Sequence, residues 1–256
     1  MRRVRVLIAP DSFKESLSGV EACSAMRAGA ERWGRVNGVE VAIDACPVAD
    51  GGEGTVEAVA GAHPSAELCR SRVTGPLGKR VEALWAKFEG ADGEWIGVVE
   101  TASCAGLMLV ARDQRDPTKT TTRGLGELIR IAAESGCGRV LVGLGSSATT
   151  EGGIGAATAL GWRFLDAMGE PIEPTGAGLL RLARVVPASA GVEARVVALC
   201  DVDNPLLGPE GTARVFARQK GATEAQIEEL ERGLENLVRC CVEAGVVCDV
   251  VRANEI

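Results

Sequence analysis

The sequence is poor in aromatic and basic residues. It has no tyrosine, and aromatic side chains make up 3% of its 256 residues. Proteins that bind single-stranded nucleic acid stack its bases on aromatic side chains, and broad binding to nucleic acid or anionic membranes requires clustered basic residues. The net charge here is −7, and the chain contains no basic run. We therefore expect no nucleic acid and no membrane among the partners of this protein.

Residues for a zinc site and segments for membrane insertion are also scarce. His63 is the only histidine, and the nine cysteines are scattered without a C-x-x-C pair. Zinc sites need closely spaced Cys and His ligands, whereas scattered cysteines are typical of small buried side chains in a reducing compartment. The first apolar run is too short for a signal peptide, and no run approaches the length of a membrane span. The sequence thus predicts a cytoplasmic protein.

Apolar runs alternate with helical patterns along the chain. Weaker strand patterns cover residues 72–73 and 81–88, with a further one at 246–251. Strands that alternate with helices indicate an α/β architecture with mostly parallel sheets. The five clearest strand predictions are at residues 4–10, 39–48, 95–101, 140–144 and 196–202.

Two capping boxes mark helix starts. In a capping box, a hydroxyl side chain is followed three residues later by Glu or Gln, and each satisfies a backbone N–H of the other. Ser18 and Glu21 form the first box, and Thr223 and Gln226 form the second. Apolar residues recur at helical spacing behind both boxes. A third helix is predicted at residues 124–135, before a glycine.

Polar residues and glycines follow the apolar runs. Ligands bind outside the carboxyl ends of strands in open parallel sheets, so these positions are candidates for a site. In chain order they are Asp11, Ser12 and Lys14; residues 50–55; residues 100–103; residues 143–153; and Asp201, Asp203 and Asn204.

The segment at 50–55 reads DGGEGT and has two interpretations. Asp50 and Glu53 fit a capping box for a helix that would bury Val56 and Val59. Glycines inside the first turn disfavour a helix, however, and they let an anion such as phosphate approach the N–H groups at a helix N-terminus. We favour the anion-binding interpretation, because the other strand ends carry polar residues as well.

Lys14, Asp201 and Asp203 predict how a phosphate and a cation would be held. A lysine just after a strand can reach phosphate oxygens, although most lysines are solvated on the surface. Asp201 and Asp203 would share a face of a regular strand, where Mg²⁺ would offset their mutual repulsion. Alternatively, one of the two caps the next turn, since Asn204 and Pro205 follow.

Two further segments are open to alternative interpretations. GLGSSA at 143–148 fits the dinucleotide pattern G-x-G-x-x-A, and Asp166 lies near the expected distance downstream, but a glycine-rich turn also explains this loose pattern. Residues 117–127 contain four threonines with Lys119 and Arg123. They form either a loop that contacts the substrate or a plain loop with Thr122 as a helix N-cap.

Several segments together resemble the bacterial-type glycerate kinase family. They occur in the family's order and cover most of the chain. Where the family usually reads GGSATNDGG, residues 145–153 read GSSATTEGG, which adds a side chain at position 146. The matching segments are IAPDSFKESLS (8–18), PVADGGEGT (47–55), VTGPLG (73–78), TTRGLGELI (121–129), GLGSSATTEGGIGAATALGWRFLDAMG (143–169), CDVDNPLLGPEGTARVF (200–216) and QKGAT (219–223).

The resemblance implies two α/β domains with mostly parallel sheets, one inserted in the other, and a cleft between them. We place the first domain at residues 1–75 plus about 241–256 and the inserted domain at 76–240. Family members continue past position 256 with a glycine-rich tail that returns to the first domain. The resemblance therefore implies that the first domain is incomplete here. A monomer or a homodimer is expected.

The resemblance also implies ATP-dependent phosphorylation of D-glycerate with Mg²⁺, giving 2-phosphoglycerate or 3-phosphoglycerate. The alternatives are an NAD(P)-dependent oxidoreductase that uses Gly143, Gly145 and Asp166, or a truncated remnant without catalytic activity. The matching positions supply the candidates, and the division of roles among them is our inference. Lys14, Asp201 and Asp11 are the predicted catalytic residues; Ser12, Asp50, Gly51, Gly52, Glu53, Gly54 and Thr55 would bind ATP; Arg123, Thr121, Thr122 and Asn204 would bind glycerate; Asp201 and Asp203 would hold Mg²⁺.

Overall fold

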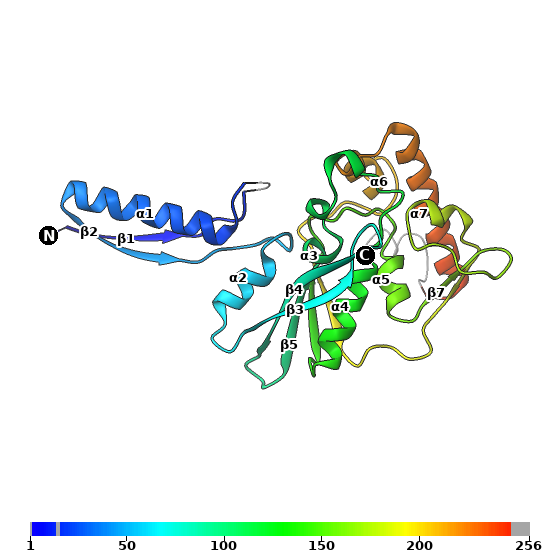
Figure 1. Cartoon of the computed structure of the whole chain (residues 1–256), viewed down its shortest axis with the longest axis horizontal. Helices are drawn as coiled ribbons and strands as arrows, with labels where there is room; N and C mark the ends of the chain where they lie inside the picture. The colour runs from blue at the N-terminus through cyan, green and yellow to red at the C-terminus, as the bar shows by residue number, and fades with distance from the viewer. Residues whose placement is uncertain (1, 14–15, 247–256) are drawn as a thin grey trace.

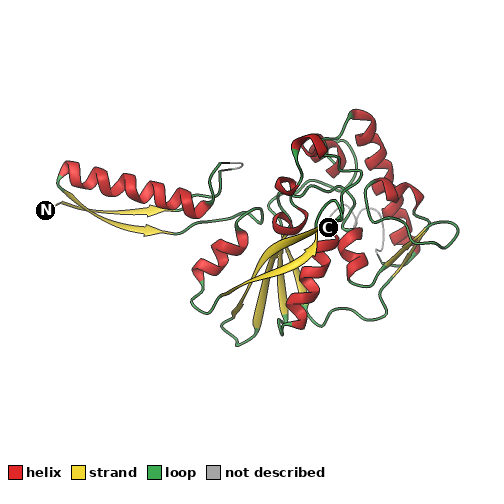
Figure 2. Cartoon of the chain, in the orientation of Figure 1, coloured by secondary structure: helices red, strands yellow, loops and turns green. Residues whose placement is uncertain are grey.

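The computed structural model describes residues 2–13 and 16–246. Lys14, one of the predicted catalytic residues, and most of the predicted strand at 246–251 lie outside these ranges. Figures 1 and 2 show a small N-terminal unit that extends away from a larger body, in which helices surround a central sheet.

The N-terminal unit consists of two strands and the helix between them. β1 (Arg2–Ile8) pairs in parallel with β2 (Val39–Ala45), and α1 (Gly19–Asn37) connects the two strands. The predicted capping box of Ser18 and Glu21 is confirmed at the start of α1. Leu7 and Val36 of this unit are 70% and 78% exposed.

The body is built on a five-stranded sheet with the order β3-β4-β5-β6-β9. β4 is antiparallel to both of its neighbours, whereas β5, β6 and β9 are parallel to one another. It follows that β3 points the same way as β5, β6 and β9, so the predicted α/β architecture with a mostly parallel sheet is confirmed. The strands are β3 (Glu67–Thr74), β4 (Arg80–Glu89), β5 (Trp95–Glu100), β6 (Arg139–Gly143) and β9 (Arg195–Leu199).

The three adjacent parallel strands correspond to the three apolar runs predicted at 95–101, 140–144 and 196–202. The two weaker patterns at 72–73 and 81–88 become β3 and β4, which form an antiparallel hairpin. The predicted domain boundary at residue 75 therefore falls in the turn between two paired strands of one sheet.

Helices pack on both faces of the central sheet. Val99 of β5 is buried with Leu128 of α4 on one face, and the preceding residue, Val98, is buried with Val56 of α2 on the other. Successive side chains of a strand point to opposite faces, which explains why these strands are apolar at consecutive positions. The helices of the body are α2 (Thr55–Ala62), α3 (Thr101–Ala105), α4 (Arg123–Glu134), α5 (Ile154–Ala159), α6 (Thr212–Phe216) and α7 (Glu224–Glu243).

A second core lies beside the sheet and is dominated by α7. The predicted capping box of Thr223 and Gln226 is confirmed at its start, and the buried face includes Leu230 and Leu234. Two short strands, β7 (Arg163–Leu165) and β8 (Arg184–Val186), form a separate antiparallel pair that the sequence patterns did not predict, because each has only three residues. The 3₁₀ turns are η1 (Leu107–Leu109), η2 (Arg112–Gln114), η3 (Ala177–Arg181) and η4 (Arg218–Lys220).

None of the helices that the structure describes is both long enough and apolar enough to cross a membrane.

Candidate active site

A cleft of about 470 Å³ opens at the carboxyl ends of β6 and β9, where ligands bind in sheets of this kind. Residues 144–147 follow β6 directly, residues 200–202 follow β9, and Asp50 and Gly52 come from the segment between β2 and α2. The lining residues are Asp50, Gly52, Leu107, Leu144, Gly145, Ser146, Ser147, Cys200, Asp201, Val202, Thr212, Phe216, Gln219 and Lys220.

Two glycines bring the segment after β2 into backbone contact with the loop after β6. The N–H of Gly145 donates to the carbonyl oxygen of Gly51 at 3.0 Å. A Cβ on Gly145 would lie 2.6 Å from the Cα of Gly52, and one on Gly51 would lie 2.8 Å from the carbonyl oxygen of Leu199. The bare backbone at these positions therefore joins two walls of the cleft.

Asp50 stabilises the turn of the DGGEGT segment, and the N-cap of the following helix is a glycine. Its Oδ1 accepts a hydrogen bond from the N–H of Gly52 at 2.9 Å. α2 begins at Thr55 with Gly54 as N-cap, and no side chain caps it there. The hydroxyl of Thr55 points back to the carbonyl oxygen of Gly52 at 2.9 Å. The Asp50–Glu53 capping box considered as an alternative is therefore not formed.

Glu100, at the end of β5, fills the position that a capping side chain would have occupied. Its Oε2 accepts the N–H of Val56 at 3.0 Å, and its side chain is buried. The pKa of Glu100 is raised to about 7, chiefly by burial and to a smaller extent by the charges of Glu57 and Glu53, while backbone hydrogen bonds from Val56 and Gly54 oppose the change. A buried carboxyl group with a raised pKa thus supports the first turn of α2.

A second buried glutamate holds the loop that carries residues 145–153. Glu151 is 1% exposed and accepts hydrogen bonds from the backbone N–H groups of Thr122, Gly153 and Gly155. The hydroxyl of Thr122 also donates to it. The carboxylate therefore satisfies the start of α5 and joins it to the start of α4.

The predicted glycerate-binding residues on α4 and before it lie away from the cleft. Thr122 is occupied by Glu151, and the N–H of Thr121 donates to the carbonyl oxygen of Pro76. Arg123 pairs with Glu127, with 3.6 Å between Nε and Oε1. These side chains hold the fold together at the start of α4 and do not line the cleft.

Of the three site residues predicted after β9, one lines the cleft and two do not. Asp201 is exposed and lines the cleft, whereas Asp203 and Asn204 do not line it. The side-chain amide of Asn204 donates to the carbonyl oxygen of Glu210 at 3.0 Å, which closes the loop between β9 and α6.

Other predicted residues line a second hollow, of about 340 Å³, between the β1–α1 loop and the start of α2. Ser12, Glu53 and Gly54 belong to it, and Asp11 lines a smaller recess beside it. Gly52 lines the cleft and its neighbour Glu53 lines this hollow, so one stretch of backbone separates the two spaces.

Lys220 is the buried cation of the cleft. It is 6% exposed, and its Nζ donates to the hydroxyl of Ser147 at 3.0 Å and to the carbonyl oxygen of Thr149. Burial lowers the pKa of Lys220 to about 8, and the charge of Glu151 opposes this change. Sequence reasoning did not single Lys220 out; the only signal was its place in the QKGAT segment.

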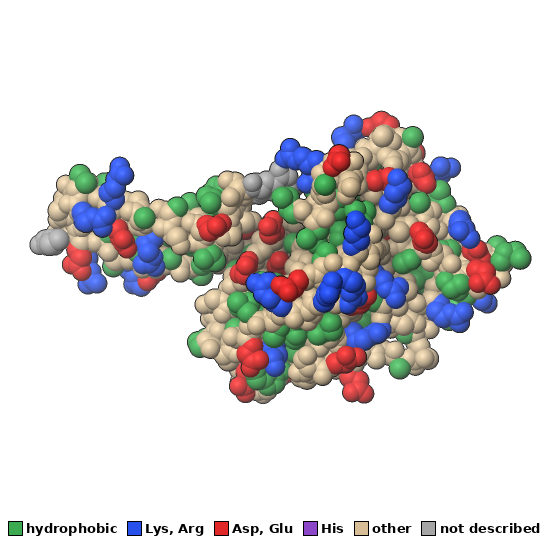
Figure 3. All heavy atoms as spheres, in the orientation of Figure 1, with side chains coloured by type: hydrophobic (Ala, Val, Ile, Leu, Met, Phe, Trp, Pro, Cys, Tyr) green, Lys and Arg blue, Asp and Glu red, His purple; other side chains and the backbone are tan. Residues whose placement is uncertain are grey.

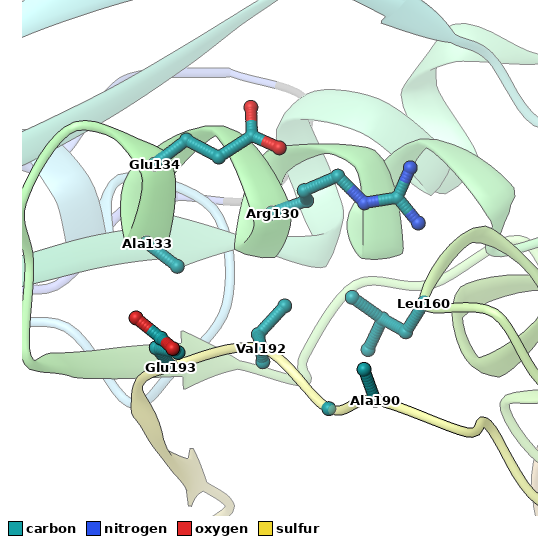
Figure 4. Close-up of a pocket in the computed structure, with 8 residues that line it drawn as sticks. Arg130, Ala133, Glu134, Leu160, Ala190, Val192 and Glu193 are labelled. Carbon is teal, nitrogen blue, oxygen red and sulfur yellow. The ribbon is translucent and has the colours of Figure 1, made fainter.

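A further pocket is lined by none of the predicted residues. Figure 4 shows a pocket of about 400 Å³ between α4 and residues 190–193, lined by Arg130, Glu134 and Val192 among others. It lies at the amino ends of β6 and β9, opposite the edge where parallel sheets bind ligands. On the face shown in Figure 3, acidic and basic side chains are interspersed.

Comparison with known proteins identifies the family. The model of the glycerate kinase family matches residues 6–253. This chain belongs to the glycerate kinase family.

Two curated relatives show how much of their length this member of the glycerate kinase family covers. Glycerate kinase of Bacillus subtilis (strain 168) is 43% identical over 238 residues, which cover 91% of this chain and 60% of that protein. Glycerate 2-kinase of Escherichia coli (strain K12) is 43% identical over 242 residues, with the same two coverages. This glycerate kinase family chain thus spans about 60% of the length of these relatives.

A solved structure agrees with the fold. The crystal structure of putative glycerate kinase 2 from Salmonella typhimurium LT2 is 39% identical and superimposes with a TM-score of 0.78, over 99% of this chain and 66% of that one.

Ser146 stands where the resemblance to the glycerate kinase family predicts a glycine. Among the described residues it is the one non-glycine with a positive φ, at 58°. A side chain is disfavoured in this backbone conformation, and such strain is often found at functional sites. The conformation explains why glycine suits this position of the cleft loop.

Asp166, the acidic residue of the alternative dinucleotide pattern, has a structural role in this member of the glycerate kinase family. Asp166 accepts hydrogen bonds from the N–H groups of Met168 and Glu170 and pairs with Arg181 at 2.7 Å. It therefore holds its own turn after β7. Nothing in the arrangement or in the comparisons supports a nicotinamide site.

Proposed function

We propose that this chain carries the phosphoryl-transfer cleft of an ATP-dependent glycerate kinase. The observation that carries the proposal is the meeting of Asp50, the 144–147 loop and Asp201 at the carboxyl ends of parallel strands, in a chain of the glycerate kinase family. Relatives named glycerate kinase and glycerate 2-kinase support glycerate as acceptor, and the second name favours its 2-hydroxyl. The D-isomer is the one that the resemblance to the family implies.

The proposed chemistry requires positioning and charge stabilisation, because the protein forms no covalent bond in most phosphoryl transfers. We assign to Asp201 the role of accepting the proton of the attacking hydroxyl group, since its carboxylate is exposed on the cleft. The backbone of residues 145–147 and Gly52 would face the transferred phosphoryl group. Asp11, Ser12, Glu53 and Lys14 remain proposed contributors from the β1–α1 side.

The cleft fits a magnesium ion bound together with nucleotide phosphates. Within the described ranges, no three side chains of the Asp, Glu, His or Cys type gather as a metal site. Mg²⁺ on nucleotides typically uses one or two protein carboxylates and takes its other ligands from phosphates and water. Asp50 would supply such a carboxylate, which leaves Asp201 to accept the hydroxyl proton. The ion, when bound, would neutralise charge on the phosphates.

Binding and turnover of the 256-residue chain test the proposal. MgATP should raise the melting temperature, NADH should not, and D-glycerate should cause release of ADP. Phosphorus NMR of the product would distinguish 2-phosphoglycerate from 3-phosphoglycerate. Stabilisation by NADH without any by MgATP, or the absence of ADP release with D-glycerate, would contradict the proposal.

A further inference from the structure

Lys220 occupies a position that a purely structural lysine rarely has. It is one of the few charged residues that are buried, yet it lines the cleft together with Ser147 and Asp201. Among the described residues that line the cleft, it is the one with a cationic side chain, and the acids there are Asp50 and Asp201. A buried ammonium group is costly unless it is paired.

The partners of the Lys220 ammonium group are neutral. Its Nζ donates to one hydroxyl group and one carbonyl oxygen, and no described carboxylate lies within ion-pair distance. An ammonium group has three N–H donors, so these two acceptors leave one donor for another partner. The charge of Glu151 acts on this ammonium group, but the oxygens of Glu151 already accept hydrogen bonds from backbone N–H groups and from the hydroxyl of Thr122. Among the described residues, Lys220 therefore forms no ion pair, and Glu151 is the one carboxylate whose charge acts on it.

The lysine is held in place from both sides. Its turn η4 is followed by Gly221, whose φ is 95° and where a Cβ would lie 2.3 Å from the carbonyl oxygen of Arg115. On the other side, Ser147 pairs with Gly106 in an isolated bridge, and the next residue, Ala148, donates its N–H to Ala105. Donors fixed in advance in a partly dry site interact strongly with an incoming anion.

We propose that Lys220 and the Ser147 hydroxyl form an anion subsite of the cleft, which receives a carboxylate or phosphate oxygen of a reactant. The subsite rests on the proposed function for the identity of that anion, which is the carboxylate of glycerate or a phosphate of ATP. Lys220 then counts as a catalytic residue in the sense that it touches a reactant.

Matched variants test the subsite through binding. Lys220→Met removes the charge, Lys220→Arg keeps it, and Lys79→Met changes an exposed lysine as a control. Calorimetry would measure the affinity of each protein for D-glycerate, MgATP and inorganic phosphate, with glycerol and adenosine as neutral counterparts.

We expect Lys220→Met to weaken the binding of one of the two reactants, D-glycerate or MgATP, by about 10- to 100-fold, since hydrogen bonds to charged groups are strong. Lys220→Arg should retain more of that affinity, and the other reactant should be little affected.

The selective loss distinguishes an anion subsite from a structural brace. Equal weakening of both reactants, or no weakening of either, would overturn the proposal. If Lys220→Met does not fold, acetylation of the wild-type chain followed by peptide mass spectrometry decides instead. A bound reactant or inorganic phosphate should then slow the labelling of Lys220 and not of Lys79 or Lys119, and unchanged labelling would reject the subsite.

The outcome for the subsite can be separated from the outcome for the kinase. If an anion protects Lys220 but D-glycerate releases no ADP, the subsite stands and the proposed function fails. If ADP is released while the Lys220 variants bind and turn over as the wild type does, the function stands and the subsite is wrong.

Discussion

The backbone N–H of Gly145 donates a hydrogen bond to the carbonyl oxygen of Gly51 across 3.0 Å. The bond joins the loop after β6 to the segment after β2, and both segments line the cleft. Because the Cα of Gly52 lies where a Cβ on Gly145 would approach to 2.6 Å, the contact excludes any side chain at position 145. The shape of the proposed active site therefore depends on this pair of glycines.

Gly145→Ala should lower both stability and turnover. The added methyl group meets backbone atoms, which cannot move as a flexible side chain would, and overpacking of this kind costs about 1–3 kcal/mol. Urea unfolding would measure the loss, and the ADP-release assay would report the displaced loop. Gly29→Ala is the control, because nothing lies within 4 Å of its added Cβ inside α1. That change should stabilise the helix by about 0.5–1 kcal/mol. Equal effects of the two substitutions would refute the close-contact argument.

Ser146→Gly should stabilise the fold. A non-glycine residue in the left-handed conformation costs about 1–2 kcal/mol, and the greater freedom of glycine in the unfolded chain offsets about half of the gain. The expected increase in the free energy of unfolding is therefore roughly 0.5–1 kcal/mol. Ser146→Ala removes the same hydroxyl group and keeps the strain, so it should give no such increase. A denaturant midpoint that moves equally in both variants would show that the hydroxyl, and not the backbone, is responsible.

Glu100 should make the stability of the protein depend on pH. Burial raises the pKa of its carboxyl group from 4.5 to about 7, so the folded state binds this proton more tightly than the unfolded state. The resulting stability is fully present below about pH 4.5 and is lost as the pH rises through about 7. Between about pH 5 and pH 8, the free energy of unfolding should fall by an amount on the order of 2–3 kcal/mol.

Glu100→Gln is the variant that isolates this dependence. The amide stays neutral at every pH, so the curve of unfolding free energy against pH should become flatter than that of the wild type. Glu57→Gln, at an adjacent carboxylate on α2, should have a smaller effect, because Glu57 acts on Glu100 only through its charge. Identical pH profiles for wild type and Glu100→Gln would mean that Glu100 titrates as an ordinary glutamate.

Local signals in the sequence predicted most of the elements. The two capping boxes at Ser18 and Thr223 are confirmed, because the hydrogen bonds that define them lie within one helical turn. The strands at the parallel centre of the sheet were predicted because burial on both faces makes them continuously apolar. The rule that polar residues gather at the carboxyl ends of strands also anticipated that Asp50 and Asp201 line one cleft.

Contacts distant in sequence account for what could not be predicted. Thr122 binds Glu151, and Lys220 reaches the loop at Ser147 and Thr149. No periodicity or motif connects such pairs, since their members come close together only in the folded chain. Most lysines lie on the protein surface. Because the burial of Lys220 cannot be inferred from the sequence, Lys220 was not among the predicted site residues.

Asp201→Asn should abolish most of the D-glycerate-dependent release of ADP while the fold is retained. The amide keeps the size of the side chain but cannot accept the hydroxyl proton, and the loss of a general base typically costs about 10²–10⁴-fold in rate. Asp203→Asn is the matched comparison, because Asp203 lies two residues away and does not line the cleft. If Asp201 acts alone, Asp203→Asn should retain nearly all of the turnover. A comparable loss in both variants would favour the paired magnesium role predicted from the sequence, and full turnover by Asp201→Asn would remove Asp201 from the mechanism.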